Sequence, residues 1–169
     1  MGLTRNEGTM WTASTLRLCM TEPAFFYVQL FSASGSLTEQ GRLSHTLPLW
    51  LRGETIRALN NALDDPQRAL SNAVILAVGR VALHETLYGD KDAARLVHRP
   101  AYHRMRAARG GAQAMGLPEL TLRLMNMFDR FMVTVLGPME KSDNRVILGS
   151  GRSFDLQIIN DYRPGAVEG

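Results

Sequence analysis

Apolar residues recur along most of the chain at spacings of three and four, which is the period of a helix with one buried face. The pattern predicts five helices, over roughly 23–33, 52–63, 66–88, 91–109 and 118–136. Pro23, Pro66 and Pro118 mark three of the starts, because proline at the first helical position loses no hydrogen bond. The expected fold class is therefore all-α, an irregular helical bundle of about five helices.

Turn and capping residues predict where these helices end and begin. A Ser/Gly-rich break is expected over 32–41. We expect Gly89 to take the left-handed conformation after a mostly apolar, central helix, and Asp90 to cap the next one. Within that next helix Pro100 clashes with the carbonyl four residues back, so a kink or break is expected near 98–100.

The domain organisation follows from where this helical pattern ends. We place one helical domain over 1–136 and a poorly ordered tail over 137–169. The tail holds two short β-prone stretches, 145–148 and 154–159, with no clear partner for either.

Composition narrows the class of protein further. The chain has 169 residues, 45% apolar and 21% charged, with a mild net charge of +3, as expected of one soluble domain. Cys19 is the one cysteine, which excludes a disulfide framework and a thiolate zinc cluster. No secretory signal or membrane-length apolar stretch is present, so a soluble intracellular protein is expected.

A basic stripe and four histidines are the first candidates for a site. The stripe has the spacing of one helix face, but no groove-reading motif accompanies it, so a solvated face is the better interpretation and direct nucleic-acid binding is not expected. The histidines form no set of three at helical spacing, so neither a metal nor a cofactor is expected. The stripe is Arg95, Arg99, Tyr102, Arg106 and Arg109, and the histidines are His45, His84, His98 and His103.

No arrangement of catalytic residues is visible, and the chain is not expected to be an enzyme. Asp64 and Asp65 lack the third acid of a magnesium-binding pair, and helix capping explains them better. Gly149, Ser150 and Gly151 lack the strand–turn–helix setting of a nucleophile elbow.

The order of motifs over about 11–136 resembles the C-terminal regulatory domain of fungal-specific transcription factors. An apolar helix ends in Glu85-Thr86-Leu87-Tyr88-Gly89-Asp90, a histidine-bearing helix ends in Arg109-Gly110-Gly111, and a third helix opens at Gly116-Leu117. The resemblance implies a nuclear regulatory domain that contacts protein partners, either itself or a full-length transcription factor, and no membrane.

The chain also departs from the family. The six-cysteine zinc-cluster module that binds DNA is absent, and the regulatory domain is normally longer, so the chain looks truncated. The alternative is a small helical enzyme or metabolite-binding protein. A deep pocket lined by His84, Arg80 or Tyr88 would favour that alternative, whereas a flat apolar helix face would favour partner binding.

The helix over 118–136 carries the expected interaction face. Truncation would uncover the main apolar stripe of this helix, with Met125, Met127 and Met132 adding adaptable side chains. The stripe consists of Leu120, Leu124, Phe128, Phe131 and Val135. Arg109 is expected to bond the carbonyls at its own helix end, or to pair with Asp129 or Glu85.

Overall fold

The computed structural model describes residues 5–139, and within them the chain is all-α, as predicted. Its long helices are α1 (Arg5–Thr21), α2 (Pro23–Glu39), α3 (Thr46–Leu63), α4 (Asn72–Tyr88), α6 (Arg99–Ala108) and α7 (Glu119–Leu136). Three short turns complete the order: α5 (Lys91–Ala93), π-helical η1 (Ala94–His98) and 3₁₀-helical η2 (Gln113–Met115). The tail expected over 137–169, with its β-prone stretches, lies from residue 140 onward outside the described residues.

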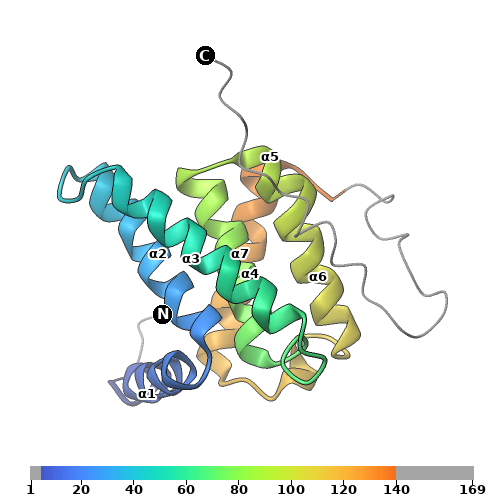
Figure 1. The fold of residues 1–169 in the computed structure, drawn as a ribbon. Helices are drawn as coiled ribbons and strands as arrows, with labels where there is room; N and C mark the ends of the chain where they lie inside the picture. Colours follow the sequence, from blue (N-terminus) through green and yellow to red (C-terminus); the bar gives the residue numbers. More distant parts are fainter. Residues whose placement is uncertain (1–4, 140–169) are drawn as a thin grey trace.

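Helix α4 runs through the middle of the bundle (Figure 1), in agreement with its nearly uniform apolarity. Helices α2 and α3 pack beside it, while η1 and α6 pack on it from another side and α7 also contacts it. The core side chains with almost no exposed surface include Val28 of α2, Val74, Ile75, Val78 and Val81 of α4, and Met105 of α6.

Helix α1 is an addition to the predicted elements. It packs against α2 and α7, with Trp11, Leu18 and Cys19 half-buried. Met10, Leu16 and Met20 point their apolar side chains to solvent on the same helix. The apolar residues therefore surround α1 instead of forming one face, and the periodic signal that marks an amphipathic helix is missing.

Helix α2 continues through most of the break expected over 32–41. Ser34 and Gly35 are buried within it. A Cβ atom on Gly35 would lie 2.5 Å from Cδ2 of Tyr88 and 2.7 Å from Cε1 of His84, both on α4. The small residues therefore mark a close approach of two helices, which composition alone does not distinguish from a loop.

The three prolines predicted to begin helices take different positions in the structure. Pro23 opens α2 as expected, and the Glu22 carboxylate caps it by accepting the Ala24 N–H at 3.1 Å. Pro66 does not open a helix: the Asp65 carboxylate accepts the Gln67 N–H in a turn, and α4 begins later, capped by Ser71. Pro118 lies one residue before α7.

The kink expected near Pro100 takes the form of a π-helical turn. The N–H of Arg99 donates to the carbonyl of Ala94, five residues back. The wider turn gives the chain an extra residue ahead of a proline that has no N–H to donate. An extra residue rotates everything after it by about 100° relative to a continuous α-helix. After this turn Arg99 and Tyr102, expected on the solvated face, are buried together with Ala101 and Met105 of the expected core face.

The glycines at helix ends follow two different rules. Gly110 and Gly111 have φ of 82° and 91° after α6, so the left-handed helix end expected there is confirmed. Gly89 has φ of −130°, so the left-handed conformation expected for it is wrong. Asp90 caps α5 as predicted, accepting the N–H groups of Asp92 and Ala93.

Candidate functional site

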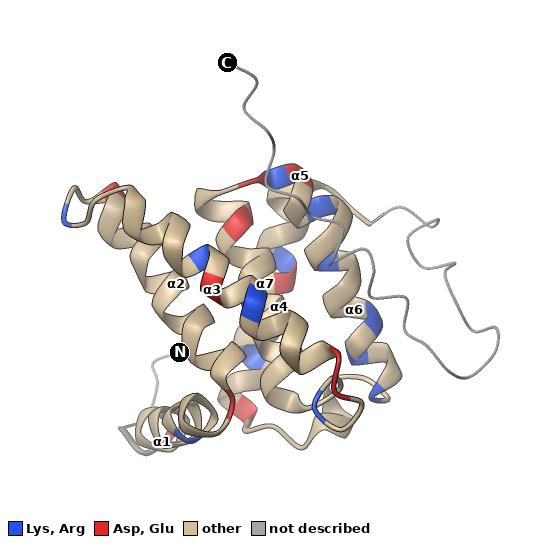
Figure 2. Ribbon diagram, in the orientation of Figure 1, with Lys and Arg blue, Asp and Glu red and all other residues tan. Residues whose placement is uncertain are grey.

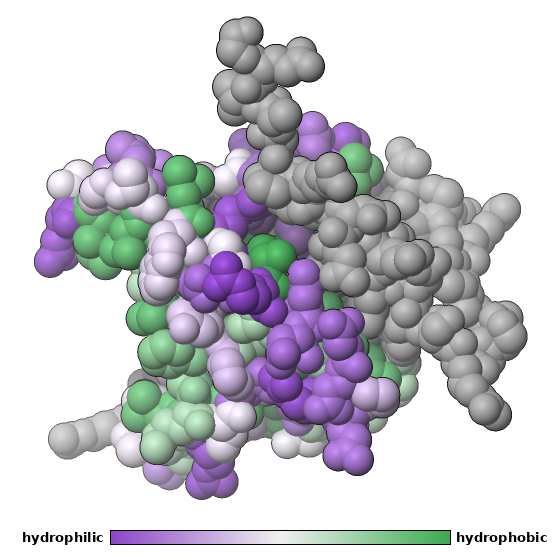
Figure 3. Space-filling model, viewed as in Figure 1, coloured by the Kyte–Doolittle hydropathy of each residue, from purple (hydrophilic) through white to green (hydrophobic). Residues whose placement is uncertain are grey.

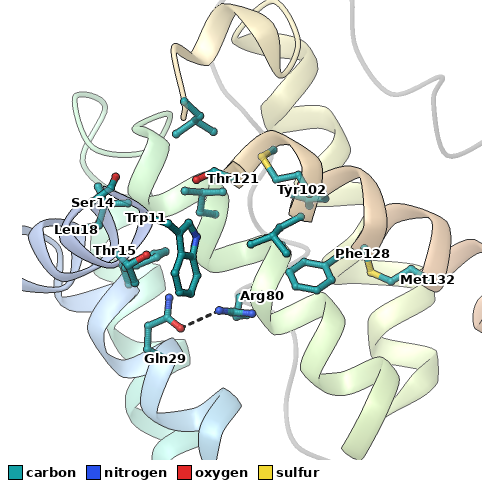
Figure 4. A pocket seen from close by; sticks show the side chains of 16 residues that line it. Trp11, Ser14, Thr15, Leu18, Gln29, Arg80, Tyr102, Thr121, Phe128 and Met132 are labelled. Atoms are coloured by element: carbon teal, nitrogen blue, oxygen red, sulfur yellow. Dashed lines mark hydrogen bonds between the residues drawn. The ribbon is translucent and has the colours of Figure 1, made fainter. Parts of the chain in front are cut away.

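A cleft lies between α1, α2, α4, α6 and α7 (Figure 4), with an interior of about 70 Å³. Its walls are largely apolar and include four aromatic rings: Trp11, Leu18, Phe25, Leu76, Gly79, Tyr102, Leu117, Leu124, Met125, Phe128 and Met132. Its polar groups are few: Ser14, Thr15, Gln29, Thr121 and Arg80. Apolar walls with a few convergent polar groups are typical of small-molecule sites.

Arg80 is the charged side chain among these lining residues. Its Nη2 donates to Oε1 of Gln29 at 3.1 Å, and its guanidinium lies 5.7 Å from the ring centre of Phe128. Burial lowers the pKa of Arg80 below its ordinary value. Within residues 5–139 no carboxylate forms an ion pair with it. The cation is thus held by neutral partners.

A second polar cluster surrounds Glu85 at the other end of α4. Its Oε1 accepts from Nε of Arg52 at 2.7 Å, and its Oε2 accepts from the backbone N–H of Asp90 at 2.7 Å. A Cβ atom on Gly89 would lie 2.0 Å from Oε2 of Glu85. Gly89 is therefore needed to admit the carboxylate, and not to permit a left-handed turn. These contacts give Glu85, Gly89 and Asp90 a structural role in joining α3, α4 and α5.

His84 and His98 are buried close to this cluster. Burial lowers the pKa of His84 to about 4 and that of His98 to about 4, and the nearby Arg52 acts in the same direction, while Glu85 opposes it. His84 packs on the Phe31 ring at 3.7 Å between ring centres. His84 and Tyr88 thus face α2, and neither lines the cleft, so of the three residues named for a metabolite pocket only Arg80 does.

The predicted basic stripe does not form one exposed face. Buried Arg99 donates to the Gly137 carbonyl at 2.7 Å, at the end of α7. Arg106 pairs with Asp129 of α7 and lies over the ring of Tyr102, which is itself buried. Figure 2 shows blue segments on several elements with red segments among them, and Figure 3 shows hydrophilic and hydrophobic residues side by side over the visible face.

The partners expected for Arg109 are taken by other residues. Asp129 pairs with Arg106 and Glu85 pairs with Arg52. Nη2 of Arg109 lies 3.5 Å from Oδ1 of Asn72. The predicted pairings of Arg109 are therefore wrong. Arg106, one turn earlier on the same helix, makes the contact with Asp129 of α7 instead.

Helix α7 divides its apolar residues between two faces. Leu120, predicted as part of the interaction stripe, is buried, as are Met125 and Met132. Leu124 and Phe128 are half-buried and line the cleft. Phe131 and Val135 are exposed, and Met127 is exposed one turn before Phe131 on the same side, whereas Val133 is exposed on another side of the helix. The predicted stripe is thus exposed in its C-terminal half and turns into the core in its N-terminal half, and its role as an interaction face stays a prediction.

Other predicted candidates have local roles in the described chain. Asp64 ends α3 and Asp65 forms the turn after it. Burial raises the pKa of the Cys19 thiol. Residues 5–139 contain no group of three His, Cys, Asp or Glu able to hold a metal, and none of their helices is long and apolar enough to cross a membrane. Gly149, Ser150 and Gly151 lie outside the described residues.

Sequence reasoning named Arg80 but missed the rest of the cleft. Trp11, Ser14 and Thr15 come from α1, which carries no periodic signal, and Gln29 and Thr121 are ordinary polar positions on their helices. The sequence feature that could have indicated the cleft was Arg80 itself, the one Lys or Arg on the mostly apolar helix α4. No protein-family model, curated protein or solved structure matches this chain. The resemblance to fungal transcription factors therefore stays a prediction.

Proposed function

We propose that this chain is a regulatory protein-interaction domain that binds the helix of another protein through the outer face of α7. The outer face consists of Met127, Phe131 and Val135, which recur every four residues along one side of α7. All three are exposed, between 38% and 53%, on a helix that buries Leu120, Met125 and Met132 in the core. This is the observation that carries the proposal, because exposed, contiguous apolar side chains on a soluble domain are typical of partner-binding surfaces.

Charge selects among the possible partners. Arg130 is exposed next to the outer face, and the nearest acid, Asp129, is already paired with Arg106. A two-fold contact between two copies of α7 would bring both Arg130 side chains to one interface, with no described acid to pair with them. An amphipathic helix with acidic residues beside its apolar stripe complements this surface better.

The transcriptional part of the proposal rests on the resemblance alone. It adds a nuclear location and a role in gene regulation for this domain. That the chain is not an enzyme also stays a prediction. Binding of a small molecule is a second candidate function, favoured by the cleft around Arg80.

The test uses two synthetic amphipathic helices with the same leucine stripe, one flanked by Glu and one by Lys. We expect the Glu peptide to bind the full chain with the higher affinity, measured by fluorescence anisotropy. The double variant Phe131→Ser/Val135→Ser should weaken binding about tenfold or more, equivalent to roughly 1.4 kcal/mol. Leu96→Ser, which changes an exposed apolar residue of η1, is the matched control and should leave the affinity unchanged.

Three results would contradict this proposal. Equal affinity for the Lys peptide would remove the role of charge, and unchanged affinity in the double variant would place the contact elsewhere. A dimer in sedimentation velocity that the double variant dissociates would make a second copy the occupant of the face.

A further inference from the structure

The cleft holds a positive charge in surroundings that do not neutralise it. Arg80 is half-buried, and withdrawing a cation from water is unfavourable unless it is paired and hydrogen-bonded. Arg80 has one neutral hydrogen-bond acceptor, Gln29, and one aromatic ring, Phe128. Figure 4 shows the guanidinium between these two side chains, with the indole of Trp11 nearby. An anion bound beside Arg80 would supply the negative charge that Gln29 and Phe128 do not.

The other residues that line the cleft indicate what the rest of the ligand would be, beyond its anionic group. Trp11 of α1 and Phe128 of α7 offer aromatic surface on two walls, and the hydroxyls of Ser14, Thr15 and Thr121 add polar contacts. The interior of about 70 Å³ is roughly half of a cavity that encloses benzene. A single ring therefore fits partly inside and partly at the open mouth, whereas a nucleotide is too large.

The single positive charge in the cleft indicates which kind of anionic group would bind there. The planar guanidinium matches a carboxylate, which accepts two parallel N–H groups. A phosphate group carries more charge and is usually met by several cations or backbone N–H groups. The lining supplies Arg80 as its charged side chain and no second cation.

We propose that the Arg80 cleft binds a small aromatic carboxylate, with its carboxylate on the Arg80 guanidinium and its ring between Trp11 and Phe128. This site is separate from the outer face of α7, because Leu124 and Phe128 line the cleft while Met127, Phe131 and Val135 point to solvent. Either proposal can fail without the other.

The chain supplies its own reporter for this site. It has two tryptophans, Trp11 in the cleft wall and Trp50, which is exposed on α3. In the variant Trp50→Phe, fluorescence comes from Trp11 alone. We expect a saturable change on titration with benzoate, and an affinity at least tenfold lower, about 1.4 kcal/mol, for the neutral analogue benzamide. Inorganic phosphate should not displace benzoate.

Two variants in the Trp50→Phe background assign the binding to the cleft. Arg80→Met should abolish the benzoate response, whereas Arg57→Met, at an exposed position on α3 outside the cleft, should keep it. Thr121→Phe should also abolish the benzoate response, because the larger side chain fills the cleft while Arg80 is retained. If Arg80→Met fails to fold, Thr121→Phe still tests whether benzoate binds in the cleft. Equal binding of benzamide, displacement by phosphate, a retained response in Thr121→Phe, or no saturable change up to about 10 mM benzoate would overturn the proposal.

Discussion

Single residues in this protein are constrained more by what they touch than by the motif that contains them. Glu85 belongs to the stretch that resembles a family motif, yet its carboxylate accepts from Arg52 and from the Asp90 backbone and is almost fully buried. Gly89 is required by the same carboxylate. A structural role for these residues is sufficient to explain why they occur together.

The variant Glu85→Gln tests that structural role. It removes the buried negative charge that pairs with the Arg52 guanidinium, which we expect to lower the free energy of unfolding by roughly 3 kcal/mol. Urea denaturation measures the change. Glu54→Gln is the control, because Glu54 pairs with the solvated Arg57 on one helix, and its loss should cost less than about 0.5 kcal/mol. A similar effect of both substitutions would mean that burial adds nothing to the Glu85 pair.

At the scale of elements, helix packing depends on glycines that look like loop residues in the sequence. Gly35 faces His84 and Tyr88, and Gly79 faces the ring of Tyr102, so α2 and α6 both approach α4 at a missing Cβ. The Ser/Gly content of 32–41 therefore predicted a break where the structure has a tight helix contact. Local composition cannot separate the two cases, because the partner helix is fifty residues away in the sequence.

Gly35→Ala and Gly53→Ala separate packing from helix propensity. Both glycines lie inside helices, but a Cβ on Gly53 meets nothing within 4 Å. Alanine at 53 should stabilise the protein by up to about 1 kcal/mol. Alanine at 35 should destabilise it by roughly 1–3 kcal/mol, because the added methyl group overpacks the contact with α4. Thermal unfolding followed by circular dichroism gives both signs, and stabilisation by both would show that α2 is not held against α4.

For the whole molecule, the sequence predicted the fold class, the buried central helix and most helix ends, since these follow from local periodicity, prolines and glycines. It did not predict α1, whose apolar residues surround the helix, or the burial of Arg99 and Tyr102, which follow the π-turn. The cleft draws on five helices, so it exists only once the bundle is assembled.

Two buried histidines make the stability of this bundle depend on pH. The pKa of His84 and that of His98 are each about 4 in the folded protein, against an ordinary value of 6.5. Between these values the unfolded chain binds more protons than the folded one, so protonation favours unfolding. The stabilisation is complete above pH 6.5 and is lost as the pH falls from 6.5 towards 4.

We expect the free energy of unfolding to fall by the order of 2 kcal/mol per histidine between pH 7 and pH 4.5. The groups that act on both histidines are Arg52 and Glu85, with Asp90 also acting on His98. Urea denaturation across this range measures the slope, and His84→Phe should reduce it, because phenylalanine cannot take up the proton and can keep the ring contact with Phe31. His45→Gln changes an exposed histidine and should leave the slope unchanged. A slope that His84→Phe does not alter would assign the pH dependence to groups outside this buried cluster.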